Sequence, residues 1–256
     1  MEEWQDLGRQ LKGYINVDTF PVAIRFLKNK ENMPEGTRTP LKHMKVKMAH
    51  CQAQAVARKY GWTIAMAKDD LGCAISGHTY GWETADPDAV VKFLTKMNYA
   101  GGSEAAKTVY QSLRCLKPGE CEAVVYSPLE RTRIKPDVIL IYLNPAQLMR
   151  CLHGSTHHTG MPITCSFSGR AASCTEGVIG AFLDQCPKVV VPGNGDRVWA
   201  TVQDHEMVYA LPASHLKQLV EGLARTHETG IRYPIPSFLR YQPEVGLTLP
   251  LTDIFK

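Results

Sequence analysis

Hydrophobic positions along the chain switch repeatedly between helical and extended spacing. Residues 2–15 repeat apolar side chains every three to four positions and predict a helix, and residues 21–26 predict a strand. Capping residues and apolar faces predict two further helices over residues 86–97 and 103–116. The almost uninterrupted apolar run over residues 138–143 predicts a central strand that is covered on both faces. This alternation of helices and strands indicates the α/β class.

We therefore expect an α/β fold with a mixed sheet and helices, in which two pseudo-related βαβ-type lobes pack as one compact unit. The chain of 256 residues is long enough to bury one large core. We interpret residues 1–256 as a single compact domain with lobes over 20–120 and 121–230. Residues 198–202 predict a late strand, and the proline-rich tail over 231–256 is expected to wrap the surface.

Two pairs of cysteines suggest an internal duplication. Cys51 and Cys73 in the first half, and Cys151 and Cys174 in the second, have separations that differ by one residue. In each pair the first cysteine lies in a helix-like stretch, and the second lies at the start of a new one. A real duplication would bring the two later cysteines to one shared cleft, whereas coincidence in an alternating α/β sequence is the competing interpretation.

Composition and charge exclude several classes of function. The net charge is +4, and basic residues are scattered apart from the cluster Lys42, His43, Lys45 and Lys47. A solvated face is the simpler interpretation of that cluster, so we do not expect nucleic-acid binding. No apolar stretch has the length of a membrane span, and the acidic start does not resemble a secretory signal, so a cytoplasmic protein is expected. Its eight cysteines are then expected to be reduced, which leaves metal ligation, catalysis or simple burial.

The surroundings of the cysteines favour thiolate chemistry. Ser173 and Glu176 have the spacing of a capping box, which would put Cys174 in the first helical position, where the helix dipole lowers a thiol pKa. Arg170 would add positive charge nearby. Cys73 follows a glycine in a turn that suits close approach to a bulky group. For Cys51 and Cys174, ordinary burial in a core or a tight turn is the alternative interpretation.

The segment Pro192-Gly193-Asn194-Gly195-Asp196-Arg197 is a candidate anion-binding loop. Backbone amides of Gly193, Asn194 and Gly195 would face a phosphate or carboxylate, and Arg197 would close over it. No P-loop motif is completed, so a tight turn is the competing interpretation.

Several of these segments together resemble the domain of unknown function 169 family, which occurs in archaea and anaerobic bacteria. The resemblance extends over most of residues 20–212 and rests on Pro21-Val22-Ala23-Ile24, Cys51-Gln52-Ala53, Gly72-Cys73, Pro136-Asp137-Val138-Ile139-Leu140, Asn144-Pro145-Ala146-Gln147, Ser168-Gly169-Arg170-Ala171, Cys174 and residues 192–197. It implies cysteines at Cys51, Cys73 and Cys174, with no such expectation for Cys151. The anaerobic distribution of the family implies an iron–sulfur cluster rather than zinc.

The leading hypothesis is an iron–sulfur protein with a four-iron four-sulfur cluster bound by Cys51, Cys73 and Cys174. The fourth ligand stays open among Cys151, Cys165, a histidine and an exogenous molecule. The cluster would perform redox or Lewis-acid chemistry on a small anionic ligand held by arginines, or serve an electron-transfer partner. No membrane partner is expected, and a homo-oligomer is one option.

Two other classes of function compete with this hypothesis. One is a cluster-free module in which the glycine-rich loop over residues 192–197, with Arg197, binds a small anion and the cysteines are simply buried. The other is a metal-free enzyme with Cys174 as nucleophile and a nearby histidine, His50 or His78, as base.

Overall fold

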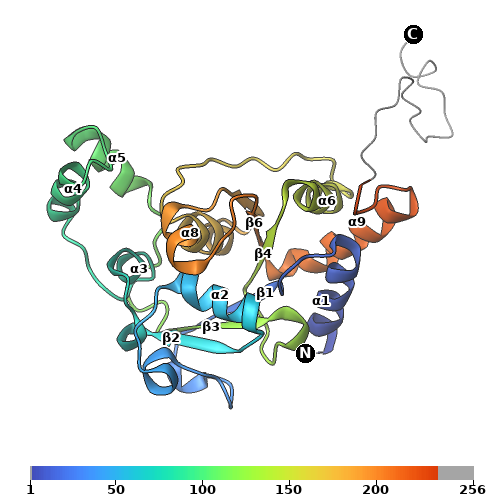
Figure 1. The fold of residues 1–256 in the computed structure, drawn as a ribbon, viewed down its shortest axis with the longest axis horizontal. Helices are drawn as coiled ribbons and strands as arrows, with labels where there is room; N and C mark the ends of the chain where they lie inside the picture. Colours follow the sequence, from blue (N-terminus) through green and yellow to red (C-terminus); the bar gives the residue numbers. More distant parts are fainter. Residues whose placement is uncertain (1, 236–256) are drawn as a thin grey trace, which may run out of the picture.

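The structure is a computed structural model that describes residues 2–235 (Figure 1). The helices are α1 (Glu2–Ile15), α2 (His50–Tyr60), α3 (Ala74–Thr79), α4 (Pro87–Lys96), α5 (Ser103–Ser112), α6 (Pro145–Thr156), α7 (Gly180–Asp184), α8 (Asn194–Ala200) and α9 (Leu216–Glu228). The strands are β1 (Val22–Leu27), β2 (Ile64–Ala67), β3 (Ala123–Pro128), β4 (Val138–Leu143), β5 (Lys188–Val190) and β6 (Met207–Pro212). Shorter helical segments include η2 (Pro40–Met44), η3 (Lys68–Asp70) and the π-helix η5 (Ala172–Ile179).

The described strands form one six-stranded sheet in the order β2-β3-β1-β4-β6-β5. This confirms the predicted α/β class and the central position of the apolar strand β4. Every pair of neighbouring strands is antiparallel. The βαβ-type lobes expected from the sequence would instead have contained parallel strands. Strand β3, from the second predicted lobe, lies between β1 and β2 of the first, so strands from both halves of the chain are interleaved in one sheet.

Both faces of the sheet are covered by helices, because alternate side chains of each strand point to opposite sides. In β4, Val138, Leu140 and Tyr142 face the cluster that includes α2 and η5. Ile139 and Ile141 of the same strand face the cluster that includes α1, α6 and α9. We call these the α2 face and the α6 face.

Local sequence signals predicted most of the helices, but tertiary packing determined the structure of residues 198–202. The predicted strand over residues 198–202 is wrong, since residues up to Ala200 belong to α8. The Asp196 carboxylate accepts a hydrogen bond from the Gly193 amide and starts this helix, and Ala200 then packs beside Cys51. Residues 236–256 of the predicted surface-wrapping tail lie outside the described residues.

Helices α4 and α5 form a hairpin that projects from the body of the protein (Figure 1). Leu94 is the buried residue of α4 and Ala106 that of α5, so this hairpin contributes little to the core. Within residues 2–235, no helix is long and apolar enough to cross a membrane.

Candidate functional site

Three cysteines from distant segments meet on the α2 face of the sheet. Cys51 is the second residue of α2, Cys73 precedes the first residue of α3, and Cys174 lies in the first turn of η5. Cys51 and Cys73 pack together with Ala200 in a small cluster, and Cys73 also packs against the core that contains Cys174. Cys51 and Cys174 are buried, whereas Cys73 is half-buried. The group therefore reaches the surface at Cys73.

Burial and nearby negative charge keep the thiols of Cys51 and Cys174 protonated. Burial raises the pKa of Cys51 to about 12, and the negative charges of Asp196 and Cys73 contribute to the rise. Burial also raises the pKa of Cys174 well above its ordinary value, and the negative charges of Asp196, Cys51 and Cys73 raise it further. The predicted helix-dipole lowering of the Cys174 pKa is therefore outweighed. Each thiolate would make the next one harder to form.

Asp196 is the carboxylate that organises the loop beside these cysteines. It is buried and accepts hydrogen bonds from the Gly193 amide at 2.9 Å, from the Ser173 amide at 3.3 Å and from the Ser173 hydroxyl. The predicted capping box of Ser173 and Glu176 is therefore wrong, since Glu176 instead accepts from the amide and hydroxyl of Ser168. Cys174 becomes the third residue of η5 rather than the first of a helix.

The turn before η5 fits closely against the loop that carries Asp196. A Cβ atom on Gly193 would lie 2.6 Å from the Gly169 carbonyl oxygen, so only glycine permits this approach. Ala171 has a φ of +47°, a left-handed conformation that non-glycine residues rarely adopt. Strained backbone and π-helical turns are both enriched at functional sites. The segments over residues 168–171 and 192–197, which both contain glycine, thus position Cys174.

A row of fully buried polar side chains extends from the cysteines along α2. His50, Gln54 and Arg58 are spaced four residues apart and therefore lie on one face of the helix. One nitrogen of each, namely Nε2 of His50, Nε2 of Gln54 and Nε of Arg58, has no hydrogen-bond partner among the described residues. Buried polar groups are usually paired, so such a row is typical of a functional site or of ordered water.

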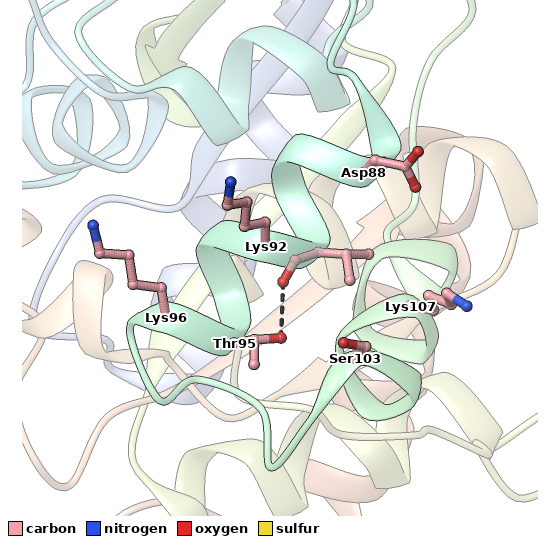
Figure 2. A pocket seen from close by; sticks show the side chains of 7 residues that line it. Asp88, Lys92, Thr95, Lys96, Ser103 and Lys107 are labelled. Atoms are coloured by element: carbon pink, nitrogen blue, oxygen red, sulfur yellow. Dashed lines mark hydrogen bonds between the residues drawn. The ribbon is translucent and has the colours of Figure 1, made fainter.

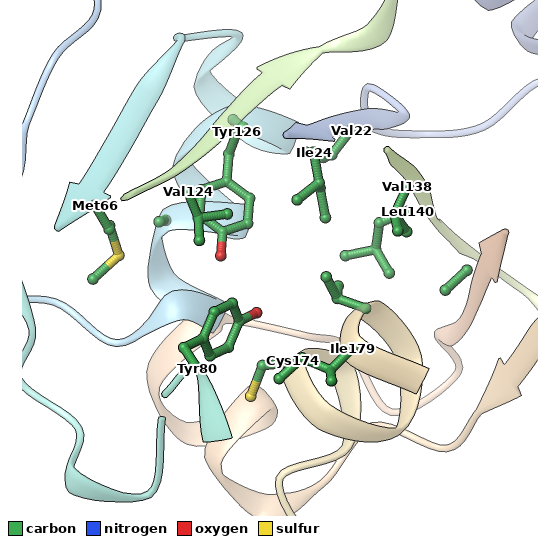
Figure 3. Close-up of a cluster of buried hydrophobic side chains, with 14 of the residues drawn as sticks. Val22, Ile24, Met66, Tyr80, Val124, Tyr126, Val138, Leu140, Cys174 and Ile179 are labelled. Carbon is green, nitrogen blue, oxygen red and sulfur yellow. The ribbon is translucent and has the colours of Figure 1, made fainter. Parts of the chain in front are cut away.

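His50 is enclosed by aromatic side chains next to Cys51. Its ring stacks on Tyr80 with centroids 3.7 Å apart, and its Nδ1 shares a hydrogen bond of 2.5 Å with the Tyr126 hydroxyl. Burial lowers the pKa of His50 to about 3, so the ring is neutral near pH 7. Tyr80 also lies beside Cys174, as Figure 3 shows for the core between η5 and the sheet.

Gln54 and Arg58 connect the row to β4 and to a buried ion pair. The Tyr142 hydroxyl donates to Gln54 Oε1 at 3.0 Å, and the Arg58 guanidinium lies over the Tyr142 ring at 3.9 Å. Arg58 donates to both carboxylate oxygens of Glu206, at 2.5 and 3.1 Å. The polar row is thereby fixed to the sheet at both ends.

The predicted anion-binding arginines have protein partners. Arg170 is exposed and donates to the Tyr99 carbonyl at 3.0 Å. Arg197 donates to the Gln203 carbonyl at 2.7 Å and lies 3.6 Å from Asp204. The Gly193 amide donates its hydrogen bond to Asp196. Asn194 and Gly195 are the first two residues of α8. Asn194 is exposed, and a Cβ atom on Gly195 would lie 3.3 Å from the Trp199 ring.

The remaining candidate ligands lie elsewhere. Cys151 is buried in the α6-face cluster, on the opposite side of the sheet from Cys51. Cys165 accepts a hydrogen bond from the Val189 amide at 3.1 Å, and it lies near Tyr209 together with Cys151. The two cysteine pairs of the sequence therefore do not form one group in the described structure, because Cys151 lies apart from Cys51, Cys73 and Cys174. His50 is the histidine adjacent to the cysteine group.

Two further features bear on ligand binding. Within residues 2–235, no three histidine, cysteine or acidic side chains lie close enough together to hold one metal ion. A surface pocket lies between α4 and α5, where Lys92, Lys96 and Lys107 surround it (Figure 2). None of the three cysteines lines that pocket.

The sequence did not predict the role of Asp196 or the buried polar row of α2. The spacing of His50, Gln54 and Arg58 is a usable signal, since three polar residues on one helix face indicate either solvent or a polar interior. The sequence does not state which of the two applies. The role of Asp196 depends on Ser173, more than twenty positions away, and left no local signal.

The comparisons with known proteins agree with the resemblance found in the sequence. A family model described as DUF169, Uncharacterised ArCR, matches residues 10–222. The chain is 26% identical over 225 residues to the uncharacterized protein MJ0308 of Methanocaldococcus jannaschii, covering 87% of this chain and 94% of that protein. No solved structure matches the chain.

Proposed function

We propose that this chain, which belongs to the DUF169 family, binds an iron–sulfur cluster of the four-iron type through Cys51, Cys73 and Cys174. The observation that carries the proposal is the convergence of these thiols from α2, the start of α3 and η5. Iron–sulfur clusters are bound by cysteine thiolates, which need not be neighbours in the sequence.

The charge balance of the site favours a cationic group. Three thiolates next to the Asp196 carboxylate would place four negative charges in a largely buried volume, which is costly without compensation. A metal centre removes this cost, because coordination displaces the thiol protons and its positive charge neutralises the thiolates. Coordination would therefore offset the raised pKa of the Cys51 and Cys174 thiols.

The arrangement of the donors favours a cluster over a single ion. A zinc ion holds its sulfur ligands at about 2.3 Å, which requires those sulfurs to lie very close together. The described residues contain no such compact group. In a four-iron cluster each thiolate binds a different iron atom, so more widely separated cysteines can serve.

A bound cluster would supply electron transfer, or Lewis-acid chemistry at a position without a protein thiolate. The chain itself contributes His50, whose neutral ring and unpartnered Nε2 lie next to Cys51. Entry of a small ligand would be from the side of Cys73, the more exposed cysteine. Arg170 and Arg197 would have to release their present carbonyl partners to bind an anion.

The metal-free nucleophile is the weaker alternative. Thiolates rather than thiols are nucleophilic, and reactive cysteines have a lowered pKa. Cys51 and Cys174 have a raised pKa, and the low pKa of His50 makes it a poor proton acceptor near neutral pH.

The test is to measure iron, acid-labile sulfide and the visible spectrum of protein purified and reconstituted without oxygen. We expect iron and sulfide in equal amounts and broad visible absorption. Cys73→Ser and Cys174→Ser should each lose most of the iron, because a serine hydroxyl is a much harder ligand than a thiolate.

Cys151→Ser is the control, since Cys151 is as buried as Cys174 but lies on the α6 face. It should keep its iron. A colourless wild-type protein after reconstitution would refute the proposal, and full iron content in both ligand variants would refute the ligand assignment.

A further inference from the structure

A basic segment borders the cysteine site. Residues 41–47 contain three exposed lysines, Lys42, Lys45 and Lys47, together with His43. This segment includes the end of η2, packs beside the edge strand β2, and leads directly into α2, which carries Cys51. Covering an edge strand in this way also prevents it from pairing with other chains.

Backbone hydrogen bonds hold this segment against the approach to Cys73. The Met48 amide donates to the Asp70 carbonyl at 2.9 Å, and the Gly72 amide donates to the Met48 carbonyl at 2.9 Å. The Lys47 Cβ would lie 3.3 Å from a Cβ atom placed on Gly72, the residue before Cys73. Lys47 therefore lies beside the residue that precedes Cys73, and Lys42 and Lys45 lie in the same exposed segment.

The three lysines of this edge form no ion pair in the described part of the chain, and the neighbouring Asp70 carboxylate accepts a hydrogen bond from the Leu41 amide at 3.0 Å. None of the three lysines lies within ion-pair distance of a carboxylate in residues 2–235. Leu41, which precedes Lys42, is 38% exposed, and Val46, which lies between Lys45 and Lys47, is 45% exposed. Exposed apolar side chains among unpaired charges of one sign are typical of a surface that binds a partner of opposite charge.

We infer that Lys42, Lys45 and Lys47 form the docking surface for an acidic electron-transfer protein, next to Cys73. This inference rests on the proposed cluster. One electron passes between the partner's redox centre and the centre held by the cysteines, so that one is oxidised as the other is reduced and no covalent bond changes. Charge steering suits such short-lived complexes, whose interfaces are small.

Charge and shape favour a protein over a nucleic acid. Residues 40–48 contain no phenylalanine, tyrosine or tryptophan on which bases could stack. Three lysines give a short basic patch rather than a groove that follows a phosphate backbone.

The first experiment measures docking without reference to the cluster. The full chain is cross-linked by a carbodiimide, which joins lysine amines to carboxylates, to reduced plant-type two-iron ferredoxin as the acidic probe. We expect cross-links at Lys42, Lys45 or Lys47 that decrease as salt is added. The variant Lys42→Glu/Lys45→Glu/Lys47→Glu should lower the yield at least about tenfold, given the usual size of steering effects.

The matched control is Lys92→Glu/Lys96→Glu/Lys107→Glu, which changes the net charge equally on the α4–α5 hairpin. It should cross-link as the wild-type chain does. Equal losses in both variants, or preferential binding of single-stranded RNA or anionic phosphatidylserine vesicles through Lys42, Lys45 and Lys47, would overturn the docking surface.

The second experiment measures electron transfer in the reconstituted protein. Reduction by ferredoxin should slow at least about tenfold in the first variant, while reduction by dithionite stays unchanged in both. If no variant holds iron, the proposed cluster fails while the cross-linking result still decides the docking surface. If iron is present and ferredoxin reduces both variants at the wild-type rate, the docking surface is wrong and the cluster stands.

Discussion

Each charged side chain that α2 buries needs a partner inside the protein. Arg58 is fully buried and is paired with Glu206 through two hydrogen bonds. Burial alone would raise the pKa of Glu206, but hydrogen bonds from Arg58 and from the Gln203 amide outweigh burial and lower it. The folded protein therefore stabilises the charged carboxylate, and the pair fixes the end of the polar row.

We expect Glu206→Gln to lower the free energy of unfolding at pH 7 by about 3–5 kcal/mol, because Arg58 is left buried without a counter-charge. The pH dependence has a definite sign. Because the folded-state pKa lies below the ordinary value of about 4.3, this stability is present above that pH and is lost as the pH falls further. Urea unfolding at a series of pH values measures both effects.

Glu228→Gln is the control for this substitution, because Glu228 pairs with Arg225 at a position where both side chains are largely exposed. Exposed pairs contribute about 0–1 kcal/mol, so the control should unfold almost as the wild type does. Equal losses for the two variants would contradict the assigned importance of the buried pair.

Among the elements, α6 and α9 are in close contact through two glycines. A Cβ atom on Gly222 of α9 would lie 2.0 Å from the Gly154 carbonyl oxygen of α6. Arg150 reinforces this pair through hydrogen bonds to the Thr226 hydroxyl and the Leu223 carbonyl. The helices can approach so closely only because both contact positions are glycine.

We expect Gly222→Ala to lower the free energy of unfolding by about 1–3 kcal/mol, because the backbone of α6 must move to admit the methyl group. Gly13→Ala in α1 is the matched control, since a Cβ atom there meets nothing within 4 Å. Alanine should stabilise that helix by about 0.5–1 kcal/mol. Thermal unfolding of both variants tests the contact, which would be misplaced if Gly222→Ala were neutral.

In the whole molecule, the two sides of the sheet differ in composition. The α6 face buries Arg150 and Cys151 among apolar side chains, whereas the α2 face contains Cys51, Cys73, Cys174, the polar row and Asp196. A group bound by Cys51, Cys73 and Cys174 would connect α2, α3 and η5, which are far apart in the chain.

We therefore expect anaerobic reconstitution with iron and sulfide to raise the melting temperature, because a ligand of the folded state alone stabilises that state. The Cys174→Ser variant should melt at the same temperature before and after reconstitution. Differential scanning calorimetry measures this shift. An unchanged wild-type melting temperature despite bound iron would mean that these three segments are not connected by the bound group.

Much of the local structure was determined by the sequence. Helix α1 occurs where apolar spacing predicted it, because burial of one helix face imposes a regular period on the residues. Strand β4 occurs at the uninterrupted apolar run, because both of its faces are buried. Residues 198–202 show the limit of this approach. Their β-branched and aromatic residues fit a strand, but the Asp196 cap and the packing of Ala200 against α2 make most of them part of a helix.

The sequence by itself also made Cys51, Cys73 and Cys174 candidate ligands, because residue type and family resemblance do not depend on how far apart residues lie in the fold. Only the tertiary structure placed Cys151 on the other side of the sheet, because α6, the helix that carries it, packs on that face. It also decided that Asp196 lies beside Cys174 and that His50, Gln54 and Arg58 face the interior. Those relations depend on how the sheet brings distant segments together, which no local pattern encodes.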